Sequence, residues 1–370
     1  MSGINRYTPL PAIEDGKDES SSGETADEKS STPDIERTDV EKTDEFSDDV
    51  VYKIEDISSE MEQRMAMLST CNDFSSQECL LHIYYFCLVM NQTGHNQNID
   101  CLKPWQLLFC QKFGEKLTTL GFVELYQKML KRHFNEEFFQ LGEGEPLRYT
   151  MDLAKGIMWN LTDKSNEICE RVIKANLHSD IVEKLSSKIL KPNLLNEESR
   201  RLVVRGFLSI LHNVVRRAPA AREALRECKT VDVLQPFREH EDDRETSFIA
   251  IVIQAHLVTE AENEKLNSDI ELFKLLVDLL DAAIKREYLY GLSFSVTEVL
   301  EVINEMAVND KNKERIVEAG ALPYYVKLIQ PDRSEGEQKE AAHGLWILAF
   351  KCKEAIKKEP HCVEGKQQVI

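Results

Sequence analysis

The stretch from Asn312 to Lys353 constrains the fold most strongly, because its sequence predicts three consecutive helices. A short helix ends at Gly320, since glycine readily adopts the left-handed conformation that terminates a helix. A second helix begins at Ala321-Leu322-Pro323, where proline is tolerated in the first turn. A long third helix follows, with small and apolar residues at helical spacing. Such a unit cannot bury its own apolar face, so we expect similar units beside it.

The same order of two shorter helices and one long helix recurs along the chain. Further long helices are predicted over residues 148–165, 197–217, 244–261 and 293–308. When the long helices are aligned, one equivalent position falls at Asn160, Asn213, His256, Asn304 and Ile347. The separations of 53, 43, 48 and 43 residues fit a helical repeat with insertions in some units. Unrelated helices in a bundle would be amphipathic but would not show this phasing.

The region from Leu153 to Pro360 resembles armadillo-repeat proteins, on the segments AGALPYYVKLIQ, EAAHGLWILAF, KGIMWNLTDKSN and SILHNVVRRAPAAREALRE. It is also similar to the helical-repeat region of large invertebrate proteins that join such repeats to a TIR domain. The resemblance implies an all-α, armadillo-like, right-handed helical-repeat solenoid. We expect divergent helical repeats over 57–146 and armadillo-like repeats over 147–370. No polar terminal cap is recognisable near Ile370, so we expect an open C-terminal end and a shortened form of a longer protein.

Residues 1–56 differ from the rest of the chain in composition. They contain 17 acidic and six basic side chains, so they contribute −11 to the total net charge of −19. Few large apolar residues are present, and such a segment cannot bury enough surface to offset its ordering entropy. We therefore predict a disordered acidic tail. The strong negative charge also argues against general affinity for nucleic acid or for an anionic membrane.

The nine cysteines are predicted to be free thiols in a reducing compartment, because their number is odd and none forms a CxxC pair. Cys79 and His82 have the spacing of two metal ligands on one helical turn, but no second pair lies at a useful distance. Packing in the core is the favoured interpretation, and no metal or cofactor is predicted. No signal peptide or membrane-spanning run is found, which favours a cytoplasmic location.

Catalytic motifs are missing from the sequence. It contains no glycine-rich phosphate loop, no HExxH, no GxSxG and no kinase signature. We therefore predict a non-catalytic scaffold or adaptor that binds a partner peptide or domain along a concave groove. The alternative is a regulatory repeat region of a larger signalling protein, whose TIR or kinase effector domain is absent from this chain.

The resemblance also implies candidate binding residues. In armadillo proteins an asparagine on each third helix commonly holds the backbone of an extended peptide, and Asn160, Asn213 and Asn304 match that position. His256 and Ile347 interrupt the series. The other interpretation is that these asparagines cap helices or pack locally.

A series of arginines between Arg200 and Arg226 could flank the groove. Arg217 lies one turn after Asn213 and is included among the candidate partner-binding residues. Guanidinium groups suit carboxylate or phosphate groups, so the strip could bind an acidic peptide or the acidic tail itself. The favoured alternative is a solvated face with pairs to nearby glutamates.

Aromatic residues at helical spacings are expected in the core rather than in a ligand site. This prediction covers six residues: Tyr84, Tyr85, Phe86, Trp105, Trp159 and Trp346. Trp159 and Trp346 fall at the same repeat position, which indicates a structural role between stacked units.

Overall fold

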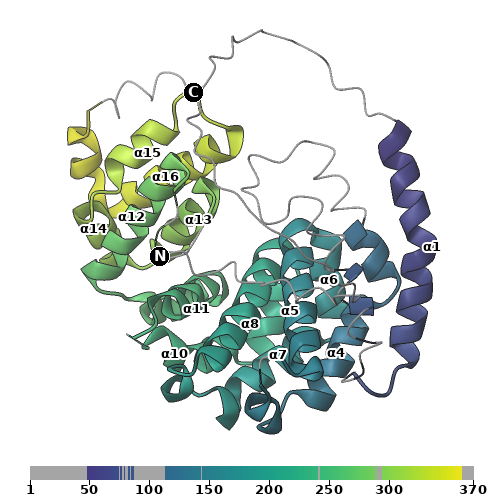
Figure 1. The fold of residues 1–370 in the computed structure, drawn as a ribbon. Coiled ribbons are helices and arrows are strands. Elements are labelled where there is room, and N and C mark those ends of the chain that lie inside the picture. Colours follow the sequence, from purple (N-terminus) through teal and green to yellow (C-terminus); the bar gives the residue numbers. More distant parts are fainter. Residues whose placement is uncertain are drawn as a thin grey trace, which may run out of the picture.

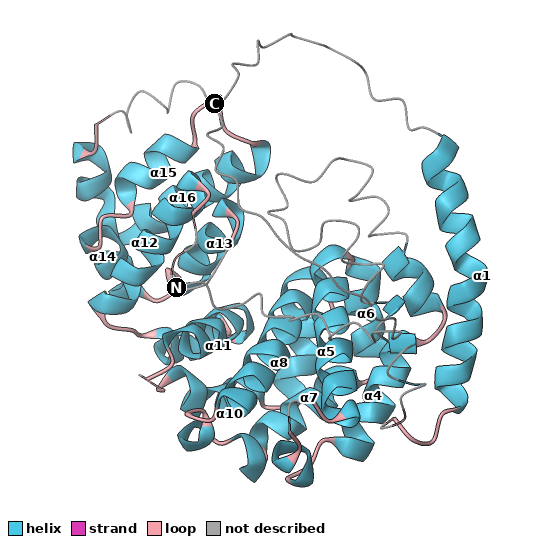
Figure 2. Cartoon of the chain, in the orientation of Figure 1, coloured by secondary structure: helices cyan, strands magenta, loops and turns pink. Residues whose placement is uncertain are grey.

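The computed structural model describes residues 48–74, 76, 79, 82–83, 85–86, 113–142, 144–240, 242–287, 289 and 294–360. Helices joined by short turns dominate these residues (Figure 2). The first helix, α1 (Asp48–Thr70), begins within the stretch that we assigned to the acidic tail, so the helical part starts before residue 57. Residues 1–47 of the predicted tail lie outside the described residues.

The first unit consists of a helical segment over 113–119, then α4 (Phe122–His133) and α5 (Pro146–Lys164). A short 3-10 helix, η2 (Glu137–Gln140), lies in the predicted loop between α4 and α5. One face of α1 covers this unit, with Met61, Met65 and Leu68 buried.

Four further units follow, each ending in one of the long helices that the sequence predicted. The second has α6 (Asn166–Lys174), α7 (Leu177–Ser186) and α8 (Glu198–Arg217), with η3 (Lys188–Leu190) and η4 (Pro192–Leu194) before α8. The third has α9 (Ala221–Glu227), α10 (Thr230–Arg238) and α11 (Arg244–Leu257). The fourth has η5 (Glu260–Leu266), α12 (Ile270–Lys285) and α13 (Val296–Met306). The fifth has α14 (Asp310–Glu318), α15 (Leu322–Leu328) and α16 (Glu335–Lys358). The all-α repeat architecture is confirmed.

A left-handed residue separates the first and second helices in four of the five units. These residues are Gly121, Asn176, Lys229 and Gly320, with φ values of 91°, 62°, 55° and 89°. Because such φ values are uncommon outside glycine, their recurrence at one position shows that the units share a backbone plan. The sequence signalled this turn only at the two glycines.

Helix α11 is shorter than predicted, ending at Leu257 rather than continuing to Ala261. The difference has a local cause. Thr259 and Glu262 form a capping box, in which each side chain bonds the other residue's backbone amide and a new helix begins. The fourth unit therefore starts with η5 immediately after α11.

The long helices α5, α8, α11, α13 and α16 pack in succession, and the units follow one another along an arc (Figure 1). Their apolar side chains form two core clusters. Ile249, Ala250 and Ile253 of α11 belong to the first cluster, whereas Ile251 and Val252 belong to the second. Helix α11 is thus a layer shared by both cores. Among the described residues, no helix is long and apolar enough to cross a bilayer.

Candidate partner-binding site

The structure brings three of the four predicted binding residues together. Asn160 is on α5, and Asn213 and Arg217 are on α8, which packs against α5. The Asn213 Nδ2 group lies 3.4 Å from the carbonyl oxygen of Trp159, and Arg217 lies 3.9 Å from the Asp163 carboxylate. Asn304 is on α13, whose apolar residues belong to the second core cluster, and does not join this group.

Asn213 is buried and makes hydrogen bonds inside the chain. Its Nδ2 group donates to the hydroxyl of Thr162 at 3.2 Å and to the carbonyl of Trp159, so it links α8 to α5. These bonds agree with local packing. A role for Asn213 in partner binding stays a prediction. Asn213 would have to replace these internal hydrogen bonds with bonds to the partner.

Asn304 is also buried, and both ends of its amide are occupied. Nδ2 donates to the carbonyl oxygen of Glu340 at 2.9 Å, and Oδ1 accepts a hydrogen bond from the Tyr325 hydroxyl at 2.8 Å. The amide therefore joins α13 to α15 and α16. Gly344 permits this approach, because a Cβ atom there would collide with Tyr325 and with Asn304 Oδ1. Partner binding by Asn304 likewise stays a prediction.

Asn160 has a different environment from these two asparagines. Its side chain is half-buried, and it forms no hydrogen bond with any described residue. Its neighbour Trp159 is 38% exposed, which corrects the prediction that this tryptophan lies in the core. We call Trp159, Asn160, Asp163 and Arg217 the Trp159 surface. It combines an aromatic face with an amide donor, an amide acceptor and an ion pair near solvent.

Trp346 also lies outside the core, contrary to the sequence prediction. It is 61% exposed on α16, and Phe350 one turn later is 69% exposed. Phe86, in contrast, is buried as predicted, and Tyr85 is partly buried. Trp105 and Tyr84 lie outside the described residues. Helical spacing shows which residues share a face, but whether a later element covers that face depends on tertiary packing.

A polar network occupies the middle of the array, where α8, α11 and α13 meet. We call it the central network; its members are His212, Arg216, Arg222, His256, Glu298, Glu301 and Glu305. Arg216 on α8 donates to Glu298 and to Glu301 on α13, both at 2.7 Å. These bonds connect the second unit to the fourth across the end of the third.

The two histidines of the central network stack with ring centroids 6.3 Å apart. Burial lowers the pKa of His212 to about 4, although the Glu298 carboxylate opposes the shift. Burial by itself would raise the pKa of Glu305, but the hydrogen bond with His256 and the charge of Arg222 outweigh it and lower the pKa. The central network therefore places a neutral His212 beside the arginine–glutamate ion pairs.

Most arginines of the predicted strip pair with carboxylates of other helices. Arg200 is buried and bonds Glu136 and Glu197, both at 2.7 Å. Arg205 pairs with Asp243 and Glu245. Arg226 bonds Glu262 at 2.8 Å. The strip thus consists mainly of ion pairs, which favours the alternative to a binding strip. Glu197 is a nearby glutamate, as expected, whereas most of the other partners lie on other elements of the chain.

The cysteines differ from the prediction at one place. The structure pairs Cys71 with Cys79, with Cα atoms 7.3 Å apart, so these two are not isolated thiols. Cys169, Cys228 and Cys352 are free, as predicted. Burial raises the pKa of the Cys169 thiol to about 12, which makes it a poor nucleophile.

No metal-binding arrangement occurs among the described residues, where no three His, Cys, Asp or Glu side chains group suitably.

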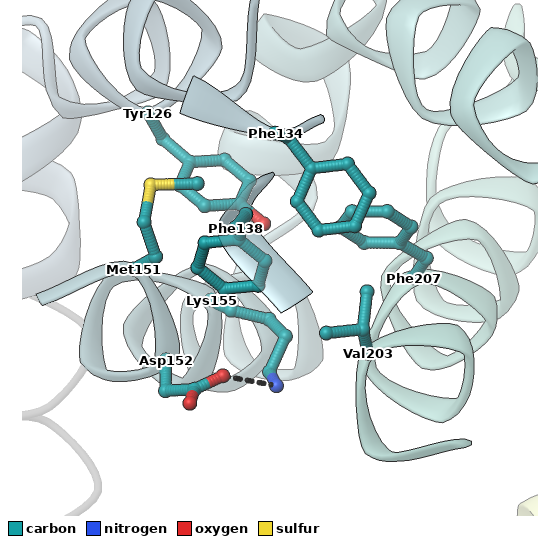
Figure 3. Close-up of a pocket in the computed structure, with 8 residues that line it drawn as sticks. All are labelled: Tyr126, Phe134, Phe138, Met151, Asp152, Lys155, Val203 and Phe207. Carbon is teal, nitrogen blue, oxygen red and sulfur yellow. Dashed lines mark hydrogen bonds and ion pairs between the residues drawn. The ribbon is translucent and has the colours of Figure 1, made fainter. Parts of the chain in front are cut away.

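A small cavity lies between α4, α5 and α8, with an Asp152–Lys155 ion pair of 2.9 Å at its edge (Figure 3). Its other lining residues are mainly apolar: Tyr126, Phe134, Phe138, Met151, Val203 and Phe207. Its volume of about 10 Å³ is near the lower limit for one water molecule, so it cannot hold a substrate.

No protein-family model matches the sequence, and no curated protein matches it either. Similar solved structures include designed and engineered proteins. A designed armadillo repeat protein is 19% identical with a TM-score of 0.45, over 78% of this chain and 99% of that chain. Another designed armadillo repeat protein, in complex with the peptide (KR)4, is 20% identical with a TM-score of 0.43. The match covers 78% of this chain and 99% of that chain. An engineered protein is 16% identical with a TM-score of 0.44, over 79% and 97%. The likeness is one of helical-repeat architecture only.

Proposed function

We propose that this chain is a non-catalytic scaffold that binds an extended peptide segment of a partner protein at the Trp159 surface. The observation that supports it most is that α5 carries an exposed Trp159 followed by a half-buried Asn160 with an uncommitted amide. A primary amide can donate to and accept from the same peptide backbone. An exposed tryptophan offers a large apolar face, which is typical of binding hot spots.

Arg217 would add charge selectivity to this surface. Its guanidinium lies 3.9 Å from Asp163, which is a loose contact, and both side chains are about one-third exposed. A carboxylate on the partner could replace that contact with a shorter, two-pronged one. Asn213 would support the site from beneath, because it bonds the carbonyl of Trp159.

A selection experiment tests this proposal without knowledge of the natural partner. Peptides selected from a random displayed library on the wild-type chain should bind the Asn160→Ala variant about tenfold more weakly, since one or two hydrogen bonds are lost. Trp159→Ala should have at least as large an effect. Lys274→Ala on α12 is a matched control, because that side chain is exposed and distant in sequence. Equal binding to all variants would exclude the Trp159 surface.

Single substitutions are preferable to removing all three asparagines. Replacing Asn304 would break buried hydrogen bonds, so a loss of binding in the triple variant could reflect a loss of folding. Asn160 has no such bonds among the described residues, and its replacement should leave the fold intact.

Three further properties of the chain stay predictions. One is a cytoplasmic location. Another is the alternative role as a regulatory part of a larger signalling protein. The third is a contact between the acidic tail and the strip from Arg200 to Arg226. That contact would require the tail to displace the carboxylates now paired with Arg200, Arg205 and Arg226.

A further inference from the structure

Helix α16 presents an exposed aromatic face that no described element covers. Lys339, His343, Trp346 and Phe350 recur at intervals of three and four residues, so they lie along one side of the helix. The Trp346 and Phe350 rings meet edge to face at 5.0 Å, and His343 stacks on Trp346 at 6.1 Å. We call these four residues the aromatic face. Large rings that are exposed together mark an interaction surface rather than ordinary surface.

The chain next to the aromatic face is basic. From Lys351 to Lys358 there are four lysines and one glutamate, a net charge of +3 in a protein of net charge −19. Lys351 is 3.8 Å from Glu314, and Lys357 is 2.8 Å from Glu354. Within the described residues, Lys339, Lys353 and Lys358 form no ion pair. An occupant of this face should therefore present apolar side chains followed by carboxylates.

A second copy of the chain fits this requirement poorly. In a parallel two-fold arrangement on α16, Lys339 would lie opposite Lys339 of the other copy. In an antiparallel arrangement with Trp346 against Phe350, Lys339 would face the basic stretch that ends at Lys358. Like charges directly opposite each other are destabilising, so both arrangements are disfavoured.

We propose that the aromatic face binds the N-terminal segment of the same chain, from Tyr7 to Glu19. Its sequence YTPLPAIEDGKDE has Tyr7, Leu10 and Ile13 at intervals of three, interleaved with two prolines. In a polyproline II helix three residues make one turn, so these three side chains would share one side. Aromatic surfaces commonly bind segments of this kind.

The charges and dimensions of the two segments match. Glu14 to Glu19 contains four carboxylates and one lysine, a net charge of −3 against the +3 of Lys351–Lys358. Three residues of polyproline II span about 9 Å, and the separation from His343 to Phe350 spans about 10 Å of helix. Leu10 and Ile13 can thus contact opposite ends of the aromatic face while Glu14 and the following acids reach the lysines.

The connection is long enough for this contact. Figure 1 shows α1 and α16 on opposite sides of the molecule. The 35-residue separation between Ile13 and Asp48 can extend to about 115 Å. Linkage within one chain also replaces a bimolecular encounter with an effective concentration in the millimolar range, so a weak contact can be well populated.

Quenching of Trp346 fluorescence tests the contact in the full chain. Trp105→Phe and Trp159→Phe leave Trp346 as the one remaining tryptophan. We expect acrylamide to quench Trp346 at least about twofold more strongly when Leu10→Ala and Ile13→Ala are added, because the bound state is lost. High salt should also increase the quenching of Trp346, since it screens the charge pairs between the two segments. Circular dichroism of each variant verifies the fold, and equal quenching with and without the two substitutions would overturn the proposal.

Cross-linking identifies the occupant directly. Phe350→p-benzoylphenylalanine in the full chain should yield, after irradiation, an intramolecular cross-link to the peptide that contains Leu10 and Ile13. A cross-link to a second copy, or to another segment of the same chain, would show that the N-terminal segment is not the occupant. The contact is independent of the Trp159 surface, so either proposal can fail without the other.

Discussion

Most residues of the central network and all residues of the aromatic face lie on the long third helices of their units, yet their side chains are used in opposite ways. In the central network, Arg216 has two glutamates within 2.7 Å, and His212 is buried. On the aromatic face, Trp346 and Phe350 are mostly exposed, and Lys339 has no ion-pair partner among the described residues. The comparison separates polar residues that hold units together from residues that remain available to a partner.

Among the substitutions that test this comparison, Arg216→Ala should lower the free energy of unfolding most. Arg216→Ala would leave Glu298 and Glu301 unpaired in a partly buried site, and we expect the free energy of unfolding to fall by about 3 kcal/mol. Urea unfolding followed by circular dichroism measures the change. Adding Glu298→Gln and Glu301→Gln should restore much of the loss. If the triple variant is no more stable than Arg216→Ala alone, the ion pairs are not the cause.

A smaller effect is expected at Asn304. Asn304→Ala removes the acceptor of the buried Tyr325 hydroxyl, and we expect a loss of about 2 kcal/mol in the free energy of unfolding. Asn160→Ala, at the equivalent repeat position, should change stability by less than about 0.5 kcal/mol. Thermal unfolding of both variants compares them. Similar losses of stability at the two positions would show that Asn160, like Asn304, stabilises the fold and is not set apart for a partner.

Buried His212 should make the free energy of unfolding depend on pH. The pKa of His212 is about 4 in the folded chain, below its ordinary value of 6.5, so the unfolded chain binds the proton first. Its contribution is present above pH 6.5 and declines as the pH falls toward 4. We expect a loss of about 1 kcal/mol between pH 7 and 5.5 from this group.

His212→Gln isolates that contribution from those of other titrating groups. Glu298, Arg216, His256 and Asp163 act electrostatically on His212 in the folded chain, and the burial effect exceeds theirs. Denaturant midpoints of the variant should fall less between pH 7 and 5.5 than those of the wild type. If the pH profiles of the variant and the wild type were parallel, the proposal that burial keeps His212 neutral would be wrong.

The smallest effect should come from the aromatic face. Trp346→Ala and Phe350→Ala remove side chains that are 61% and 69% exposed, so each should change the free energy of unfolding by less than about 0.5 kcal/mol. Calorimetry of both variants provides the measurement. A loss of more than about 2 kcal/mol at either position would show that these rings are part of the folded core.

Local sequence signals predicted much of the fold. Pro323 and Gly320 defined the junction where α15 begins, and the apolar period placed α8 within one residue of its observed start. The turn at Lys229 was not predictable, because lysine has no preference for a positive φ and adopts it here as part of the folded unit.

The candidate site was less predictable, since accessibility depends on residues far away in the sequence. Asn304 is buried because Tyr325 and Gly344 bring two later helices against it. Asn160 occupies the equivalent position and retains an uncommitted amide. Trp346 has the spacing of a core residue, and no described element packs over it. The repeat position alone therefore could not distinguish a structural side chain from a binding one.

The sharing of α11 between the two core clusters has a consequence for folding. In a simple repeat array, each unit contacts only its neighbours, and the ends can open while the middle stays folded. Here α11 supplies apolar side chains to both clusters, so losing it would expose both at once. Amide hydrogens of α11 should therefore exchange with solvent only when the whole array opens, which makes this helix the point of cooperativity between the two halves.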